Sequence, residues 1–343
     1  MAYISFQPSD YFNTKLYTGN GSTQSISSVG FQPDWLWIKN RDGTNNHILQ
    51  DAVRGATKSL ESDGDGAETT SSTRVTSFDS DGFSIGSAGT NNTNTNNYVS
   101  WNWKANGSGS ANTDGSISST VSANTTSGFS IVTYTGTGSA GTVGHGLNSA
   151  PSVIIQKKTS ASATWLVKHP GIGTNGYIRL DATNTSATDS AIWNSTDPTS
   201  TVFSIGTDAT INGSGATSVA YCFAEKQGFS KFGSYTGNGN NDGTFVYTGF
   251  APAFLLFKNA SVATSWVMHD TKRDTFNVSG KGLFPNETSA ESSTAGRELD
   301  ILSNGFKIRN PNGEKNTLGN TYIYMAFAEA PLVTSGNIPA TAR

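Results

Sequence analysis

The sequence is short of cysteine, of charge and of long apolar runs, and each shortage excludes a class of protein. Among 343 residues there is one cysteine, Cys222, so a disulfide framework within the chain is excluded. No apolar run is long enough for a membrane helix, and the N-terminus "MAYISFQPSD" lacks the basic and apolar regions of a signal peptide. We therefore expect no membrane insertion, synthesis in a reducing compartment, and release by a route other than signal-directed secretion if the protein works outside a cell.

Charged residues make up 14% and apolar residues 34% of the sequence, both below the usual share. The formal net charge of -3 argues against nucleic-acid binding, which needs clustered Lys and Arg. Disorder would require a high net charge with few aromatic residues, whereas aromatic residues here reach 10%. Gly, Ser, Thr and Asn make up the difference, a composition typical of a β-rich protein with thin cores and many polar loops.

Helical patterns are scarce as well. Few stretches of even ten residues are free of Gly, Pro or dense Ser, Thr and Asn, and no apolar stripe with helical spacing stands out. Tight-turn dipeptides are frequent instead, because Asn and Asp tolerate positive φ and Gly has no Cβ. Examples are Asn20-Gly21, Asp81-Gly82, Asn238-Gly239 and Asn304-Gly305. The sequence therefore predicts an all-β fold.

One short phrase occurs three times: "YTGNG" at Tyr17, "YTGTG" at Tyr134 and "YTGNG" at Tyr235. Each copy is followed by an apolar segment that begins with proline and ends with lysine. These segments read "PDWLWIK", "PSVIIQK" and "PAFLLFK", and they end at Lys39, Lys157 and Lys258. Because both alternating sets of positions are apolar, we expect strands that are buried on both faces.

Each copy closes on a further strand, "YVSWNWKA", "VAYCFAEK" or "IYMAFAEA". Alternation in these strands separates large apolar residues on one face from mostly smaller residues on the other. The larger set is Val99, Trp101 and Trp103, then Val219, Tyr221 and Phe223, then Ile323, Met325 and Phe327. The other set is Ser100 and Asn102, then Ala220, Cys222 and Ala224, then Tyr324, Ala326 and Ala328.

Landmarks in the same order at near-constant spacing indicate an internal repeat of about 100 residues, long enough for each unit to bury its own core. We predict three tandem β-sandwich domains of jelly-roll or lectin-like type. The predicted boundaries are an N-terminal docking segment 1–15, repeats at 16–106, 129–228 and 229–332, and a C-terminal tail at 333–343. Residues 107–128 are a polar linker, either flexible or a set of very polar strands.

Local motifs for catalysis or metal binding are missing. The run "ESDGDGAE" from Glu61 to Glu68 alternates carboxylates without completing a calcium loop, so we interpret it as a solvated acidic turn. The four histidines do not stand at metal-binding spacings, and nucleophile-elbow, Walker and zinc-protease motifs are absent from the sequence. We expect no enzymatic activity, no metal and no cofactor.

Two Asp–Arg pairs occupy equivalent places in the repeat. Asp51 and Arg54 follow His47 at the offsets at which Asp270 and Arg273 follow Trp266. Such a cluster after a core strand suits the binding of a sugar or a partner. The alternative, which we favour, is a pair that pins a loop to the sandwich.

Trp193 is the candidate for an exposed aromatic contact. The other copies carry apolar residues at the positions of Trp35, Trp37, Trp101 and Trp103, which indicates a core role for those four. Trp193 lies in the polar segment "SAIWNSTDP" without an evident packing partner. An exposed ring of this kind can stack on the apolar face of a sugar.

The first repeat resembles a known family. "QPSDYFNTKLYTGNG", "VGFQPDWLWIKNR", "LQDAVRGATKSLESD", "TSFDSDGFSIGS" and "YVSWNWKA" together resemble a repeat module of tail fibre-like virion structural proteins in marine and cyanobacterial tailed phages. The resemblance covers about Gln7 to Ala105; the second copy keeps the related "TWLVKHPGIGTNGYIRLDATN", and the third diverges further. It implies no catalytic residues.

The resemblance implies a protein of the virion exterior, made in the host bacterial cytoplasm, released by lysis and assembled as a homo-oligomer, a trimer by analogy. The expected function is that of a tail fibre or spike-type adhesin that contacts a host surface glycan. The alternative is a capsid decoration or tail-associated subunit that binds other virion proteins. An adhesin predicts exposed aromatic and polar residues together on the loops of one domain, above all the third, whereas a decoration protein predicts apolar surface spread over the flanks of the domains.

Overall fold

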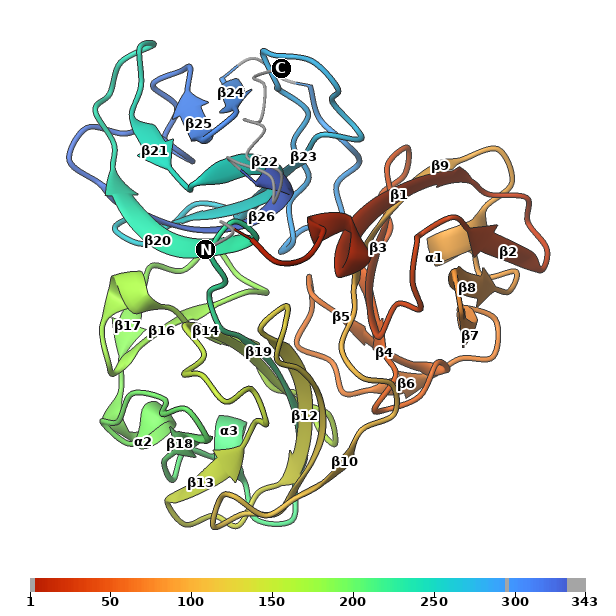
Figure 1. Cartoon of the computed structure of the whole chain (residues 1–343), viewed down its shortest axis with the longest axis vertical. Coiled ribbons are helices and arrows are strands. Elements are labelled where there is room, and N and C mark those ends of the chain that lie inside the picture. Colours follow the sequence, from red (N-terminus) through yellow and green to blue (C-terminus); the bar gives the residue numbers. More distant parts are fainter. Residues whose placement is uncertain (1–3, 294–295, 332–343) are drawn as a thin grey trace.

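The computed structural model describes residues 4–293 and 296–331, and this part of the chain is almost entirely β (Figure 1). Three lobes lie around a common centre, each built from a larger and a smaller antiparallel sheet. We call them lobe 1 (4–106), lobe 2 (107–228) and lobe 3 (229–331). The predicted all-β sandwich architecture is confirmed.

Lobe 1 begins with the 3-10 helix η1 (Pro8–Asp10) and carries the short helix α1 (Gly89–Asn92). Its larger sheet has the order β1 (Phe12–Thr18), β9 (Asn97–Trp103), β3 (Trp35–Asn40), β4 (Ile48–Asp51), β5 (Lys58–Glu61) and β6 (Thr69–Thr70). Its smaller sheet has the order β2 (Gln24–Ser27), β8 (Gly82–Ile85) and β7 (Val75–Asp79).

Lobe 2 follows the same plan with an addition at one edge. Its larger sheet has the order β10 (Ser110–Asn112), β11 (Ser119–Asn124), β12 (Phe129–Thr135), β19 (Thr217–Phe223), β14 (Val153–Lys158), β15 (Leu166–Lys168), β16 (Gly176–Arg179) and β17 (Ala187–Thr188). The smaller sheet pairs β13 (Gly141–Gly144) with β18 (Val202–Ile205). The helical turns are η2 (Pro170–Ile172), α2 (Ser190–Trp193) and α3 (Ala209–Asn212).

The added edge of lobe 2 comes from the segment 107–128, predicted as a polar linker. Its strands β10 and β11 extend the sheet, and all of β11 pairs with β12. The segment is thus part of lobe 2 and takes the second of the two forms considered, polar strands. Ser and Thr suit an edge strand because one side of it faces water.

Lobe 3 completes the set. Its larger sheet has the order β20 (Ser230–Thr236), β26 (Thr321–Pro331), β22 (Phe250–Asn259) and β23 (Val267–Asp270). Its smaller sheet has the order β21 (Phe245–Tyr247), β25 (Gly305–Ile308) and β24 (Leu299–Leu302). The smaller sheet lies on the outside of lobe 3, away from the common centre (Figure 1).

The closing strands β9, β19 and β26 show the predicted alternation. Their larger residues all belong to one cluster at the centre of the molecule, where the three larger sheets meet. The smaller residues of β19 and β26 face the interiors of their own sandwiches instead. Each lobe therefore has a core of its own, and all three share a further one, which we call the central cluster.

Aromatic rings join the lobes within the central cluster. Trp35 of lobe 1 stacks on Tyr221 of lobe 2, with ring centroids 4.3 Å apart. Phe12 of lobe 1 lies 5.3 Å from Phe327 of lobe 3, and Phe223 of lobe 2 lies 5.8 Å from the same ring. Because aromatic side chains bury large apolar areas, this cluster stabilises the arrangement of the lobes as well as each lobe.

The repeated phrase has the same structural role in each lobe. The Tyr17 hydroxyl donates to the carbonyl oxygen of Asn91 at 2.8 Å. Tyr134 donates in the same way to Ile211, and Tyr235 to Lys315, also at 2.8 Å. Each phrase therefore ties the end of its strand (β1, β12 or β20) to the segment just before the closing strand.

A buried asparagine next to that contact completes the tie, and the sequence comparison missed it. The side-chain oxygen of Asn92 accepts from the backbone N–H of Asn20 at 2.8 Å, and its amide donates to Gly86. Asn212 and Asn316 make the same contacts in the other lobes, and all three are fully buried. In the sequence, an asparagine recurs at the equivalent position before each closing strand, and this recurrence could have indicated the contact.

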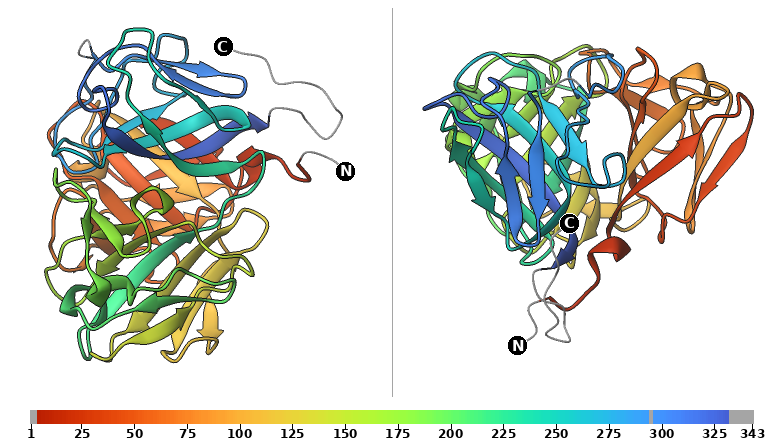
Figure 2. Two further views of the ribbon diagram at one scale, coloured as in Figure 1. Left: turned by 90° about the vertical axis from the view of Figure 1, so that its left-hand side faces the viewer. Right: turned by 90° about the horizontal axis from the view of Figure 1, so that it is seen from above.

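The predicted N-terminal docking segment 1–15 is part of lobe 1 where the structure describes it. Ile4 and Phe12 are buried in the central cluster, and Phe6 packs edge-on against Phe229 at 5.5 Å. Figure 2 shows η1 at the same end of the molecule as the end of β26. Residues 4–15 thus close the junction of lobes 1 and 3, because their apolar side chains are buried there; the predicted tail 333–343 lies outside the described residues.

Candidate functional site

The first Asp–Arg pair is buried between lobes 1 and 2. Asp51 ends β4, and its Oδ1 accepts the backbone N–H groups of Val53 and Arg54, which fixes the turn that follows. The Arg54 guanidinium Nε lies 2.5 Å from Asp51 Oδ2. The pair therefore first serves its own loop.

The same pair also reaches lobe 2. The Tyr221 hydroxyl donates to Asp51 Oδ2 at 2.8 Å, and Arg54 Nη2 donates to the Tyr221 oxygen at 3.1 Å. Burial raises the pKa of Tyr221 well above its ordinary value, which keeps this hydroxyl a donor. Arg54 Nη1 also lies 3.0 Å from Glu68 of lobe 1, and the Glu68 backbone N–H donates to the Thr159 carbonyl oxygen of lobe 2 at 2.9 Å. The run interpreted as a solvated acidic turn therefore contacts lobe 2.

The second Asp–Arg pair holds lobe 3 against lobe 1. Arg273 Nε lies 2.5 Å from Asp270 Oδ2, and Arg273 Nη1 lies 3.0 Å from Glu291. The indole N–H of Trp101 in lobe 1 donates to Asp270 at 3.0 Å. Trp101 and Tyr221 occupy equivalent positions of their closing strands, so the two pairs make equivalent contacts with the next lobe in the ring.

His169 fills the corresponding place between lobes 2 and 3. Its Nδ1 accepts the Gly171 backbone N–H at 3.1 Å, so Nε2 carries the proton and donates to the Tyr324 carbonyl oxygen at 3.1 Å. We call each junction of two neighbouring lobes a seam. Each of the three seams is therefore held by a side chain at the end of β4, β15 or β23 of one lobe. This side chain contacts the closing strand of the next lobe.

The lysines of the repeat add a second set of seam contacts. Lys39 donates to the carbonyl oxygen of residue 288 at 2.9 Å, Lys157 to that of residue 65 at 3.0 Å, and Lys258 to that of residue 183 at 3.1 Å. In each case the acceptor belongs to another lobe. Burial lowers the pKa of each lysine to about 8. A lysine that recurs at one position of a buried strand was the signal for this role.

The predicted site residues therefore serve the seams. Asp51, Asp270 and Arg273 are buried, and Arg54 is nearly so, which leaves neither of the two predicted Asp–Arg pairs exposed to a sugar. This placement agrees with the favoured interpretation of a pair that pins a loop. The two Asp–Arg pairs lie at two equivalent seams, so they do not form one common site.

Trp193 is not an exposed contact; the interpretation of its segment as an open loop was wrong. The ring is fully buried in the sandwich core of lobe 2. Residues 190–193 form the helical turn α2, which Asp189 caps by accepting the Ala191 backbone N–H at 2.8 Å, and this turn directs the indole inward.

Metal-binding groups do not come together in the described part of the chain. No cluster of His, Cys, Asp and Glu there is suited to a metal ion. Burial lowers the pKa of all four histidines, to about 4 in the case of His169. These histidines hold structural positions in which the protonated, cationic form of the ring is disfavoured.

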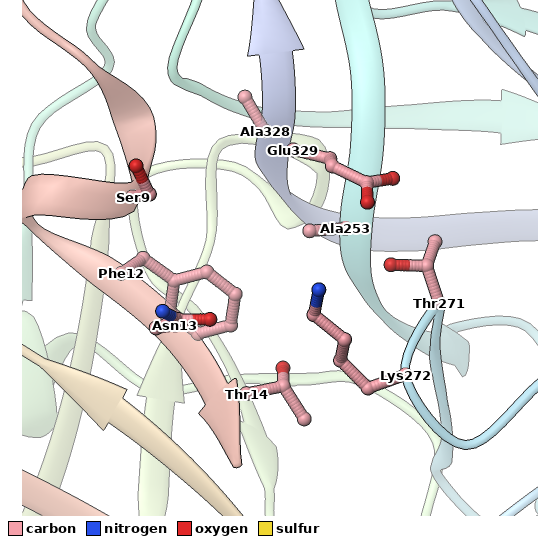
Figure 3. Close-up of a pocket in the computed structure, with 9 residues that line it drawn as sticks. All are labelled: Ser9, Phe12, Asn13, Thr14, Ala253, Thr271, Lys272, Ala328 and Glu329. Atoms are coloured by element: carbon pink, nitrogen blue, oxygen red, sulfur yellow. The ribbon is translucent and has the colours of Figure 1, made fainter. Parts of the chain in front are cut away.

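Two cavities have linings of mixed polar and apolar atoms. Figure 3 shows one of about 130 Å³ at the seam of lobes 1 and 3, where Lys272 and Glu329 come from lobe 3 and Thr14 from β1. The other, about 410 Å³, lies in lobe 2, where Lys168 Nζ is 3.1 Å from the Asp197 carboxylate. In the second cavity the Thr174 hydroxyl also donates to the Asp197 carboxylate, at 2.9 Å.

The exposed apolar surface is concentrated in one lobe. In the described part of the chain, the large apolar side chains that are exposed all belong to lobe 3. They are Phe245 (45% exposed), Tyr247 (55%), Val262 (42%), Phe276 (79%), Val278 (49%) and Leu318 (75%).

Two of these rings lie on the outer face of the smaller sheet, which we call the lobe 3 outer face. Register places Phe245, Lys307 and Asp300 in one row across β21, β25 and β24. Tyr247, Gly305 and Leu302 form the next row. Phe276 and Val278 precede β24 in the chain. Their segment lies beside this edge strand, because Ser279 forms an antiparallel bridge with Leu299.

Charged groups lie beside the rings. Lys307 Nζ is 2.7 Å from the Asp242 carboxylate, and Arg309 lies 3.8 Å from Asp242 and 3.4 Å from Asp300. Two acidic and two basic side chains thus alternate in one chain of ion pairs at the lobe 3 outer face. Because their formal charges cancel, this surface offers hydrogen-bond donors and acceptors without a net charge.

The sheets of the other lobes carry small residues at the same positions. Register aligns Phe245 with Ser25 of β2 and Thr142 of β13. It aligns Tyr247 with Ser27 and Gly144. Sequence reasoning missed these aromatic residues because it aligned only the landmarks that all copies share.

Comparison with known proteins gives a family. A family model described as a domain of unknown function (DUF7483) matches residues 7–331. No curated protein matches the chain. Within the described residues, no helix is both long and apolar enough to cross a membrane.

Proposed function

The chain belongs to the family described as a domain of unknown function (DUF7483), and we propose, on other grounds, that it is a structural protein of a phage virion exterior that contacts the host surface as a tail fibre or spike does. The sequence resemblance of the first repeat supports the virion part of the proposal. The family match runs through all three lobes, so the closed arrangement of lobes is the unit to which a function must be assigned.

The observation that carries the adhesin role is the lobe 3 outer face. Contiguous exposed aromatic residues commonly mark interaction sites. Phe245 and Tyr247 are half exposed, whereas lobes 1 and 2 have Ser, Thr or Gly at these positions. A decoration protein that packs through the flanks of all its domains would favour similar apolar surfaces on all three lobes. The observed concentration on lobe 3 supports one specialised contact surface.

The proposed role is binding rather than catalysis. His169 and the two Asp–Arg pairs stabilise the seams, and the charged groups of the lobe 3 outer face lie beside aromatic rings. A rigid scaffold with one exposed face suits attachment, because little conformational entropy is lost when a preformed surface binds.

Imaging of virions that carry the protein, compared with virions from which its gene has been deleted, tests the proposal. We expect density at the tail tip or on tail-side appendages, and loss of adsorption to host cells when the protein is removed. Density over the head or in the tail wall, with adsorption intact and fragile particles, would instead identify a decoration or tail-associated subunit.

A further inference from the structure

We infer that the lobe 3 outer face is a binding site for an uncharged glycan chain, with Phe245 and Tyr247 as the stacking platform and the adjoining charged side chains as hydrogen-bond partners of its hydroxyl groups. This inference rests on the proposed function, because it names the ligand of the surface that carries the adhesin role. It adds the class of ligand and the residues that bind it.

The two rings suit the apolar faces of sugars. Phe245 and Tyr247 are two residues apart on β21, so their side chains lie on the same face at a spacing of roughly 7 Å. Their exposed fractions of 45% and 55% leave about half of each side chain uncovered. This spacing is comparable to one sugar unit, so consecutive units of a chain can contact consecutive rings.

Charge complementarity favours a neutral ligand. Asp242, Asp300, Lys307 and Arg309 carry formal charges that cancel, and they already pair with one another. A nucleic acid or an anionic lipid surface would need an excess of positive charge, which this face does not have. Sugar hydroxyls both donate and accept, so they can bind carboxylates and cationic groups together.

The position of the charges also disfavours a protein partner. Lys307 lies on the central strand β25 of the face, between Phe245 and Asp300 in the same row. The centre of a protein interface is depleted in charged residues, because burying such groups without full compensation is costly. A glycan leaves them partly hydrated and hydrogen-bonded, so the cost does not arise.

Lobe 1 supplies the variant that tests the site. Ser25 and Ser27 hold the positions of Phe245 and Tyr247 in an equivalent sheet, so the double variant F245S/Y247S introduces residues that this type of strand accommodates. The variant L318S is the matched control, because Leu318 is 75% exposed in lobe 3 and lies outside the platform. Circular dichroism and thermal melting check that both variants fold.

Affinity gel electrophoresis of the full chain measures binding to dextran, mannan and galactomannan as neutral probes, with heparin as the anionic probe. We expect at least one neutral probe to retard the wild-type protein and the L318S variant, at both low and high ionic strength. The F245S/Y247S variant should bind that probe about tenfold more weakly, because it loses two stacking contacts.

Three results of the electrophoresis overturn the inference. These are retardation by heparin alone, no retardation by any neutral probe, and equal retardation of the double variant and wild type. Concentration-dependent self-association in sedimentation that disappears in the double variant would also overturn it, since a second copy would then be the occupant of the face.

The test separates this inference from the proposed function. If virions lose adsorption without the protein but adsorb normally with F245S/Y247S, the adhesin role stands and the glycan site fails. If the double variant loses neutral polysaccharide binding while virions without the protein adsorb normally, the glycan site stands and the adhesin role fails.

Discussion

His169 is held in its neutral form by burial at the seam of lobes 2 and 3. Burial lowers its pKa to about 4, whereas an exposed histidine titrates near 6.5. Between these values the unfolded chain binds a proton that the folded chain does not. The free energy of unfolding therefore falls as the pH drops from 6.5 towards 4, and by linkage this one group accounts for roughly 3 kcal/mol.

The substitution His169→Gln tests this contribution, because glutamine can still donate to the Tyr324 carbonyl oxygen but does not titrate. We expect the variant to lose less stability than the wild type between neutral pH and pH 4, although it is less stable near neutrality. Urea denaturation at a series of pH values measures the difference. Parallel pH curves for the two proteins would show that His169 does not contribute.

Arg273 neutralises two carboxylates, and its removal should be costly. The substitution Arg273→Leu leaves Asp270 fully buried and Glu291 largely buried without this partner. We expect a loss of about 3–5 kcal/mol in the free energy of unfolding. The control Lys231→Leu breaks a 2.9 Å ion pair with Glu225 that is exposed, so its cost should stay below about 1 kcal/mol. Similar losses in the two variants by chemical denaturation would contradict the structural role assigned to Arg273.

At the scale of single elements, the repeated Tyr-Thr-Gly phrase needs its glycine for close backbone approach. A Cβ at Gly136 would lie 2.4 Å from the carbonyl oxygen of Gly213, so Gly136→Ala must displace one of the two segments. We expect a loss of about 2 kcal/mol. Gly66→Ala is the control, because nothing lies within 4 Å of its Cβ position. Calorimetric melting should show a lower midpoint for the first variant alone; equal midpoints would remove the packing explanation for the phrase.

Periodicity predicted which residues of an element share a face, but not what that face packs against. The larger faces of β9, β19 and β26 were identified correctly, yet their burial between lobes depends on contacts among residues more than a hundred positions apart. The same limit applies to the site. Asp51 was recognised as a loop residue, whereas its contact with Tyr221 requires the arrangement of two lobes.

Local context misled where an apolar residue stands among polar ones. Trp193 is surrounded by Ser, Asn and Thr in the sequence, but one helical turn is enough to direct its ring into a core. β11 was left open as linker or strand, because Ser and Thr suit both. The aromatic residues of the lobe 3 outer face stand out only when the strand register of the structure aligns them with Ser, Thr or Gly in the other two lobes.

At the scale of the whole molecule, the seams close a ring within one chain. Lobe 1 contacts lobe 2, lobe 2 contacts lobe 3, and lobe 3 contacts lobe 1 through equivalent residues. A closed cyclic arrangement uses up its own contact surfaces. The trimer expected by analogy stays a prediction, and it would have to form through faces other than the seams.

Because the lobes share the central cluster, we expect the chain to unfold as one unit. An isolated lobe 2 (residues 107–228) would expose Phe129, Tyr221 and Phe223, each of which contributes about 1.5–3 kcal/mol when buried. That loss is comparable to the whole stability of a typical domain. Scanning calorimetry of the full chain should therefore give a single transition with equal calorimetric and van't Hoff enthalpies, and the isolated lobe should be unfolded or aggregated. Three separate transitions, with lobe 2 alone melting at the temperature of one of them, would mean that the sandwich cores suffice and that the central cluster only docks finished domains.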